Sequence, residues 1–317
     1  MNPEISVAVS DVSKSFGKTE ALRSISLSAG KGELFGLIGP DGAGKSTLFR
    51  VLTTLLLPGS GTATVAGFDV VRNYRDIRRI VGYMPGRFSL YQDLTVEENL
   101  KFFASIFKTT VAENYDLIRD IYAQLEPFKK RPAGKLSGGM KQKLALCCAL
   151  IHRPEVLFLD EPTTGVDAVS RREFWEMLRR LKTEGITIMV STPYMDEAML
   201  CDRVALMQKG GLLQVDTPQG IIGQYKLPLW AVTGDDLYGT MGQLKHFEGI
   251  QSAYLFGDSI HLATRNNTVT EAMILSHLQK TTSSKIEVHK IEASIEDCFM
   301  SLMEPEQLTQ VHKVESS

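Results

Sequence analysis

Short apolar runs in the first two thirds of the chain predict buried strands that alternate with helical segments. Three such runs, at 33–38, 156–159 and 186–190, are continuous, as expected of strands with both faces covered. A helix-like run from about 45 to 56 follows the first and is ended by the proline and glycines at 58–61. This alternation predicts an α/β fold.

A long stretch between the first two of these strands, about 85–153, is mostly helical in pattern, so we predict a helical insertion in the α/β core. Another helix is expected at about 168–184, capped by Asp167 and stopped at Gly185. Its buried face should carry Phe174, Leu178 and Leu181. Its charged residues are expected on the solvated side: Arg171, Arg172, Glu173, Arg179, Arg180 and Lys182.

The pattern changes after about Gly223, which divides the chain into a first domain, 1–223, and a small second domain, 224–304. The second domain contains short strand-like pieces at 229–232, 260–263 and 286–291, so we expect an α+β accessory domain. Its role is open, and stabilising a dimer is our hypothesis. A polar tail, 305–317, completes the chain.

Composition narrows the class of protein. The 317 residues carry 35 Lys and Arg against 37 Asp and Glu, a net charge of -2, which argues against a bulk nucleic-acid binder. The longest apolar run, 144–151, is too short to span a membrane, and the N-terminus lacks the pattern of a signal peptide. The four cysteines, Cys147, Cys148, Cys201 and Cys298, are expected as small buried side chains in a reducing compartment.

A glycine-rich loop between the first strand and the following helix matches the pattern G-x-x-x-x-G-K-[ST]. Its residues are Gly39, Pro40, Asp41, Gly42, Ala43, Gly44, Lys45, Ser46 and Thr47. Glycines let backbone N–H groups surround a phosphate, and the helix N-terminus favours an anion. Lys45 is expected to reach the β- and γ-phosphates, and Ser46 to bind Mg²⁺. The alternative is a plain glycine turn with a surface lysine; the strand before it and the helix after it argue against this.

Two further groups of candidate functional residues follow along the chain. The first opens a helix that runs to about Ile151 and forms a second candidate anion site: Leu136, Ser137, Gly138, Gly139 and Met140. Alone it would more often be a common turn. The second is the apolar strand that ends in Asp160 and Glu161; Asp160 would face the Mg²⁺ shell and Glu161 would act as general base. Gly165, Val166 and Asp167 come shortly after.

These motifs, in this order and spacing, resemble the nucleotide-binding domain of an ABC ATPase over about 7–220. The resemblance implies a P-loop NTPase core with an antiparallel β subdomain and the helical insertion at about 85–153, with ATP and Mg²⁺ as cofactors. It also implies a head-to-tail pair in which each ATP lies between one chain's phosphate loop and the other's signature residues, 136–140. Gly165, Val166 and Asp167 correspond to the family's D-loop. Phe16 would stack on adenine; its alternative role is a buried strand-edge side chain.

The segment 291–299 resembles the one that closes the ATPase subunits of ABC-2-type exporters of the daunorubicin-resistance and multidrug kind, and 81–85 and 90–100 fit the same group. This implies a separate transmembrane permease, whose coupling helix should meet the surface around 85–91, and a place on the cytoplasmic face of the bacterial inner membrane. Two alternatives stay open: a non-transport ABC module, or an importer ATPase. A neighbouring permease gene would favour the exporter.

Two residues depart from the family pattern. Gly86 stands where a glutamine normally contacts Mg²⁺ and the attacking water, and Pro193 stands where a histidine normally contacts the γ-phosphate. Gln92, six residues after Gly86, is a weak candidate to replace the glutamine. One interpretation is neutral variation with hydrolysis rescued otherwise. The sharper hypothesis is a site that binds Mg-ATP but hydrolyses it slowly, in a heterodimer whose partner ATPase has complete motifs and uses this chain's intact signature.

Overall fold

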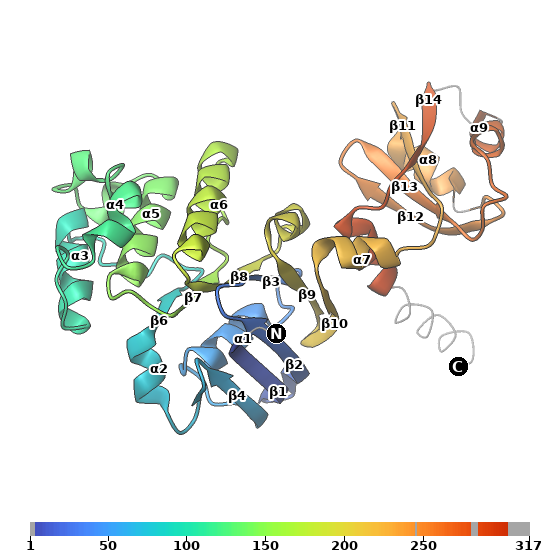
Figure 1. Ribbon diagram of the computed structural model, residues 1–317. Helices are drawn as coiled ribbons and strands as arrows, with labels where there is room; N and C mark the ends of the chain where they lie inside the picture. The colour runs from blue at the N-terminus through green and yellow to red at the C-terminus, as the bar shows by residue number, and fades with distance from the viewer. Residues whose placement is uncertain (1–3, 245, 280–284, 304–317) are drawn as a thin grey trace. The chain divides into compact units, whose positions relative to one another are not determined.

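The structure, a computed structural model, describes residues 4–244, 246–279 and 285–303. The chain divides into two compact units, one through Pro218 and one from Gln219 (Figure 1). The predicted boundary at Gly223 therefore falls inside helix α7 (Pro218–Gln224), which begins the second unit. The predicted polar tail, 305–317, lies outside the described residues. Among the residues that the structure describes, every helix is too short or too polar to span a bilayer.

A six-stranded sheet forms the centre of the first unit, in the order β10-β9-β3-β8-β7-β6. All neighbours are parallel except β9 and β10, which are antiparallel. The strands β3, β7 and β8 are buried along their whole length, which explains their continuous apolar sequences. The six strands are β3 (Leu34–Ile38), β6 (Val81–Met84), β7 (Val156–Asp160), β8 (Thr187–Thr192), β9 (Arg203–Gln208) and β10 (Gly211–Asp216). The predicted α/β fold is confirmed.

A second, antiparallel sheet packs against this core in the order β2-β1-β4-β5. Its strands are β1 (Ile5–Phe16), β2 (Thr19–Gly30), β4 (Ser60–Val65) and β5 (Phe68–Asp69). Helix α1 (Lys45–Leu52) shares one hydrophobic core with both sheets, and Phe49 meets Phe158 of β7 edge-on, with ring centroids 5.5 Å apart. The short helix α2 (Tyr74–Ile80) leads from this sheet into β6. This is the antiparallel subdomain implied by the family resemblance.

The helical insertion contains α3 (Val96–Ile106), α4 (Tyr115–Tyr122) and α5 (Gly138–Leu150), with 3-10 turns at Glu126–Phe128 and Ala133–Lys135. These helices lie together, apart from the antiparallel sheet (Figure 1). The side chain of Thr95 accepts a hydrogen bond from Glu98 N at 3.2 Å, and the Glu98 carboxylate bonds back to Thr95 N at 2.8 Å, so a capping box starts α3.

Helix α6 (Ala168–Thr183) forms as predicted. Asp167 caps it by accepting from Ser170 N and from Val169 N, and these bonds, the one from Ser170 first, hold the pKa of the Asp167 carboxyl below its usual range. Phe174, Leu178 and Leu181 are buried. The helix predicted at about 45–56 is α1, and it ends earlier than expected, at Leu52. The chain turns there, and Leu55 N and Leu56 N both donate to Arg50 O instead of continuing the helical hydrogen-bond pattern.

The second unit is a four-stranded antiparallel sheet in the order β12-β13-β11-β14, with a hydrophobic core of its own. Its elements after α7 are β11 (Leu229–Gly234), α8 (Leu237–Leu244), β12 (Ile250–Phe256), β13 (Ser259–Thr264), α9 (Glu271–Gln279) and β14 (Ile286–Ile291). Residues 295–303 are also helical. The three predicted strands correspond to β11, β13 and β14. β12 was missed because a register shift between Ile250 and Ser252 disturbs its alternation of apolar and polar residues.

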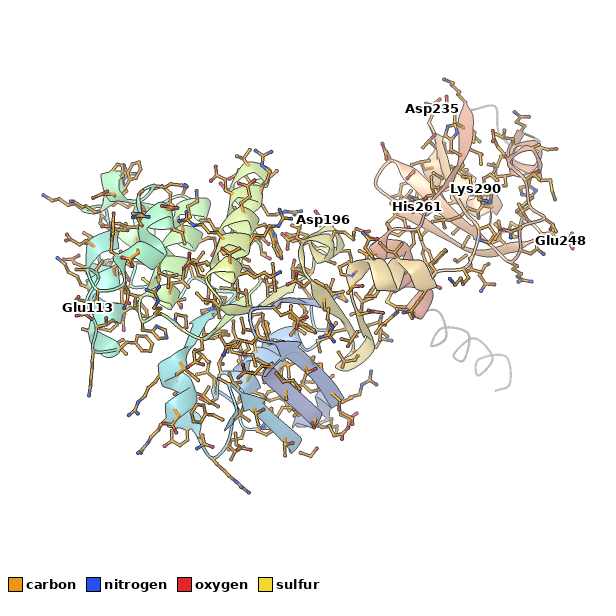
Figure 2. All side chains as sticks on the ribbon, in the orientation of Figure 1. Glu113, Asp196, Asp235, Glu248, His261 and Lys290 are labelled. Atoms are coloured by element: carbon orange, nitrogen blue, oxygen red, sulfur yellow. The ribbon has the colours of Figure 1, made fainter. Side chains whose placement is uncertain are left out.

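Buried polar contacts fix the segment 291–299 within the second unit. Asp297 is 4% exposed; its Oδ1 lies 2.7 Å from His261 Nδ1, and its Oδ2 accepts from Ser294 N and Ser294 Oγ. His261 is labelled on β13 in Figure 2. All four cysteines are buried and free, as predicted, and burial raises the pKa of the Cys298 thiol to about 11. They are therefore packing residues.

Candidate functional site

The phosphate loop, residues 39–47, joins the end of β3 to the start of α1, the connection that the sequence predicts. Gly44 is the N-cap of α1 with a φ of 104°, a left-handed conformation that favours glycine. A Cβ on Gly44 would lie 2.5 Å from Ala21 O, and one on Gly39 would lie 2.2 Å from Met207 O. Glycine is therefore required at both ends of the loop for steric reasons.

Lys45 folds back over this loop. Its side chain is 3% exposed, and its ammonium donates to Gly39 O at 2.6 Å and to Pro40 O at 3.1 Å. The ammonium also lies 3.5 Å from Glu161 Oε1. A buried ammonium must be paired or hydrogen-bonded, and these carbonyl and carboxylate partners meet that need. The arrangement puts a fixed positive charge inside the loop, so Lys45 is not the surface lysine of the plain-turn alternative.

Ser46 and Asp160 meet at the carboxyl end of β7. Ser46 Oγ donates to Asp160 Oδ1 at 2.9 Å, although 114 residues separate them. Ser191, from the neighbouring strand β8, donates to the same Asp160 oxygen at 2.6 Å. Hydroxyl and carboxylate oxygens are the ligands that Mg²⁺ prefers, so this pair fits that ion.

Glu161 follows in a strained backbone conformation, with a φ of 51°. Its N–H lies 3.0 Å from Ser191 Oγ and 3.1 Å from Ser191 O, so β8 holds the residue in place. Its carboxylate lies near Lys45 and 3.5 Å from Thr164 Oγ1. The side chain is 23% exposed, enough to reach a water molecule beside the loop.

A cleft of about 560 Å³ opens beside the phosphate loop. Phe16, at the end of β1, lies on its rim with 49% of its surface exposed, so it is not a buried strand-edge residue. An exposed aromatic ring is a surface on which a flat base can stack. The lining residues are Phe16, Thr19, Glu20, Ala21, Gly42, Ala43, Gly44, Lys45, Ser46, Thr47, Glu161 and Lys209.

The two departures from the family pattern border this site. A Cβ on Gly86 would lie 3.8 Å from the carboxyl carbon of Asp160. Gln92, the weak candidate for the role that the sequence analysis expects of a glutamine at position 86, lies elsewhere: its backbone oxygen accepts from Gly134 N at 2.9 Å, and its Oε1 is near that glycine. Pro193 comes directly after Thr192, whose carbonyl accepts from Gly39 N at 3.2 Å. Residue 193 thus borders the start of the phosphate loop without a side-chain donor.

The signature segment, residues 136–140, does not line the cleft of its own chain. Ser137 caps α5 by accepting from Met140 N at 3.4 Å, and Ser137 and Gly138 are exposed. Gly139 faces α6, because a Cβ there would lie 2.8 Å from Ser170 Oγ. The D-loop residues Gly165, Val166 and Asp167 lead into α6. The signature segment and the D-loop are therefore neighbours, at the adjacent N-termini of α5 and α6.

Two sets of side-chain contacts were not predicted from the sequence, those of Ser191 and those of Arg171. Ser191 holds both Asp160 and Glu161, and its signal was its place at the end of a predicted strand parallel to theirs. Arg171, expected on the solvated side of α6, keeps 28% of its side-chain surface exposed, but it also pairs with Asp196 and with buried Glu197. Figure 2 labels Asp196 on the segment after β8. Helical spacing alone did not show this partner segment.

Comparison with known proteins agrees with this geometry. The ABC transporter family pattern matches residues 22–164. The chain is 50% identical over 192 residues to the probable multidrug ABC transporter ATP-binding protein YbhF of Escherichia coli (strain K12), a match covering 60% of this chain and 33% of YbhF. It is 38% identical over 225 residues to the Nod factor export ATP-binding protein I of Rhizobium sp. (strain N33), covering 70% of this chain and 74% of that protein.

Among solved structures, cbiO1 from Clostridium perfringens, described as part of the ABC transporter complex cbiONQ, matches with a TM-score of 0.62 and 27% identity. The match covers 70% of this chain and 92% of cbiO1. The chain spans about a third of the length of the YbhF proteins that it matches. The fold is that of an ABC ATPase, with a P-loop NTPase core. The chain belongs to the family of ABC transporter ATP-binding proteins.

Proposed function

We propose that this chain binds Mg-ATP and is the ATP-binding subunit of an ABC-2-type exporter that drives a separate membrane permease. The observation that carries the proposal is the convergence of Lys45, Ser46, Asp160 and Glu161 on one side of the phosphate loop. Support for export comes from the similarity to the Nod factor export ATP-binding protein I and to the probable multidrug transporter protein YbhF, and from the segment 291–299. The near-neutral charge gives no support for a nucleic-acid partner.

Each residue then has a separate role. The backbone amides of 39–47 and the Lys45 ammonium bind the phosphates, while the Phe16 ring stacks on adenine. Ser46 and Asp160 hold Mg²⁺, which neutralises phosphate charge when bound. Glu161 accepts a proton from the attacking water as general base. Ser191 fixes the Glu161 backbone N–H, and so directs this carboxylate toward the phosphate loop.

The exposed signature segment supports a paired arrangement. Because Ser137 and Gly138 are exposed and lie outside their own chain's cleft, they are free to complete a cleft on another ATPase chain. The adjacent D-loop would lie at the same interface. We propose a heterodimer, because Gly86 and Pro193 weaken only the site of this chain, whereas its signature is intact. The site here would hold ATP and hydrolyse it slowly; the partner's site would hydrolyse it at normal speed.

An apolar groove of about 420 Å³ between the core and the helical insertion is our candidate for the permease contact. Met84, Pro85, Leu90, Phe103 and Phe107 contribute to its lining. An amphipathic helix binds such a groove through its apolar face. Docking there would place the chain on the cytoplasmic face of the bacterial inner membrane.

The second unit is our candidate for strengthening the pair. Because α7 begins this unit and Ile221 O lies 3.8 Å from Cys298 Sγ, a deletion that tests this role should start before α7, after Asp216. Weaker pairing of the shortened chain would support the role. Unchanged pairing would remove it.

The central experiment measures Mg-ATP binding and steady-state hydrolysis by the full chain. We expect tight binding with little turnover. Lys45→Ala should abolish binding, because the ammonium inside the loop is lost. Arg119→Ala, on the exposed side of α4, is the matched loss of a cation and should leave binding unchanged. A chain that binds no nucleotide, or one in which Lys45→Ala binds as tightly, contradicts the proposal.

A further inference from the structure

Asn99 of α3 is fully buried, and the polar atoms of its side chain bond to the backbone of residues 91–95. Its Oδ1 accepts a hydrogen bond from Tyr91 N at 3.1 Å. Its Nδ2 lies 3.0 Å from Tyr91 O, 3.2 Å from Leu94 O and 3.0 Å from Thr95 O. A buried amide is costly unless it is hydrogen-bonded, and this one has partners for both of its polar atoms. Asn99 therefore fixes the shape of this short loop.

The loop 91–95 is bonded on its other side to the chain just before the signature segment. Gln92 O accepts from Gly134 N at 2.9 Å, and Leu94 O accepts from Ala133 N at 2.8 Å. Leu94 O is thus shared between Asn99 and Ala133. A single carbonyl connects the buried amide of α3 to the segment 131–134.

That segment leads directly into the signature. A 3-10 turn at Ala133–Lys135 is closed by Leu136 N, which donates to Ala133 O at 3.2 Å, and Ser137 then caps α5. At its other end the loop continues into Leu90, a residue of the apolar groove. The groove is therefore joined to this loop by chain connectivity through Leu90, and the loop that Asn99 shapes is joined by hydrogen bonds to the segment before the signature.

We propose that Asn99 is a positioning residue that sets the place of the signature segment, and hence its fit to the nucleotide bound by a partner chain. Asn99 is absent from the lining of its own chain's cleft, so it acts on the partner's nucleotide rather than on its own. The inference rests on the proposed pairing through the signature. Its distinctive consequence is a loss of pairing without a loss of ATP affinity.

The test replaces the Asn99 amide with a carboxylate. Asn99→Asp keeps an acceptor for Tyr91 N but sets an oxygen against three carbonyl oxygens. Hydrogen exchange should become roughly tenfold to a hundredfold faster at the amides of 133–140 and stay unchanged in α1. The matched control is Asn114→Asp: Asn114 Nδ2 donates to Ile151 O and Thr109 Oγ1 in the same subdomain, away from the signature segment. It should leave 133–140 unchanged.

The functional measurement is ATP-driven self-association of the Glu161→Gln chain, a pair in which neither site keeps the carboxylate that we assign as general base. Asn99→Asp should weaken pairing about tenfold or more while the isolated chain binds ATP with unchanged affinity. If Asn99→Asp does not fold, Asn99→Ser is the second variant: its hydroxyl stands at the place of the amide carbon, one bond short of Oδ1 and Nδ2, and the loss of the amide bonds should produce changes in the same direction. Unchanged exchange at 133–140, or faster exchange with unchanged pairing, would overturn the inference.

The two proposals fail in different ways. A chain that binds no ATP contradicts the proposed function. A Glu161→Gln chain that binds ATP but pairs neither with itself nor with a partner ATPase contradicts the proposed interface. In both cases the exchange at 133–140 still decides whether Asn99 holds the signature segment.

Discussion

A Cβ built on Gly86 would have the carbonyl oxygen of Asp160 as its nearest neighbour, at 3.1 Å. A side chain at this position would therefore begin beside the carboxylate that we assign to Mg²⁺. The distance is slightly tight, so Asp160 must give way by a few tenths of an ångström. Glycine leaves this edge of the site without a polar side chain.

The first prediction restores both missing groups. Gly86→Gln together with Pro193→His should raise steady-state turnover by about 10²- to 10³-fold, because preorganised donors at a reacting phosphate contribute on that scale. Adding Glu161→Gln to the same chain should remove the gain. Rapid hydrolysis by the unmodified chain would instead mean that Glu161 suffices, and the heterodimer proposal would lose its main support.

The second prediction concerns Ser191. Ser191→Ala removes one hydrogen bond to Asp160 and one to the N–H of Glu161, so the free energy of unfolding should fall by about 1–2 kcal/mol. Mg-dependent ATP affinity should fall with it, by roughly tenfold. Urea unfolding and nucleotide titration measure the two effects. Ser105→Ala, which loses an exposed bond to Phe102 O, is the control and should change neither.

The third prediction compares how tightly two neighbouring glycines of the signature segment are packed. Gly139→Ala forces a methyl group against Ser170 of α6 and should cost about 1–3 kcal/mol of stability. Gly138→Ala meets nothing closer than Gly165 O at 3.6 Å, so its stability should be close to that of the unmodified chain. Thermal unfolding distinguishes them. Equal stability of the two variants would show that the contact with Ser170 relaxes freely.

The fourth prediction follows from His152, which lines the apolar groove. Burial lowers the pKa of His152 from 6.5 to about 4, although the hydrogen bond of its Nε2 to Val81 O acts in the opposite direction. Between about pH 4 and pH 6.5 the His152 ring is therefore neutral in the folded chain and protonated in the unfolded chain. The associated stability is complete above pH 6.5 and is lost as the pH falls to about 4.

Over that pH range the loss from His152 should be about 2–3 kcal/mol. Denaturant unfolding at several pH values measures it. His152→Gln should reduce this pH dependence. Identical pH profiles for the unmodified and His152→Gln chains would contradict the assignment.

Much of the first unit could be predicted because its signals are local. The phosphate loop, the acidic end of β7 and the cap of α6 each depend on residues within one short segment, and the structure has all of these elements. Contacts between distant segments could not be predicted. The approach of Gly139 to Ser170, the two bonds of Ser191 and the pairing of Arg171 depend on how strands and helices pack.

In the second unit, prediction from the sequence was limited by irregular strand pairing and by the position of the domain boundary. β12 was missed because its register shift interrupts the period of two on which strand prediction depends. The domain boundary was predicted at Gly223 because the short strand-like segments begin after that residue. Packing instead places most of α7 in the second unit. In the same way, Gln92 looked close to the site in sequence, but its contacts are with Gly134.

The left-handed backbone at Glu161 matters for anyone who wishes to engineer this protein. A φ of 51° costs most non-glycine residues about 1 kcal/mol or more, and asparagine or glycine tolerates it better. Glu161→Asn or Glu161→Gly would relieve this backbone cost, but either change would also remove one of the three oxygen partners of the buried Lys45 ammonium. Because the same change removes the carboxylate that we assign as general base, the backbone at this position can be relaxed only with a loss of activity.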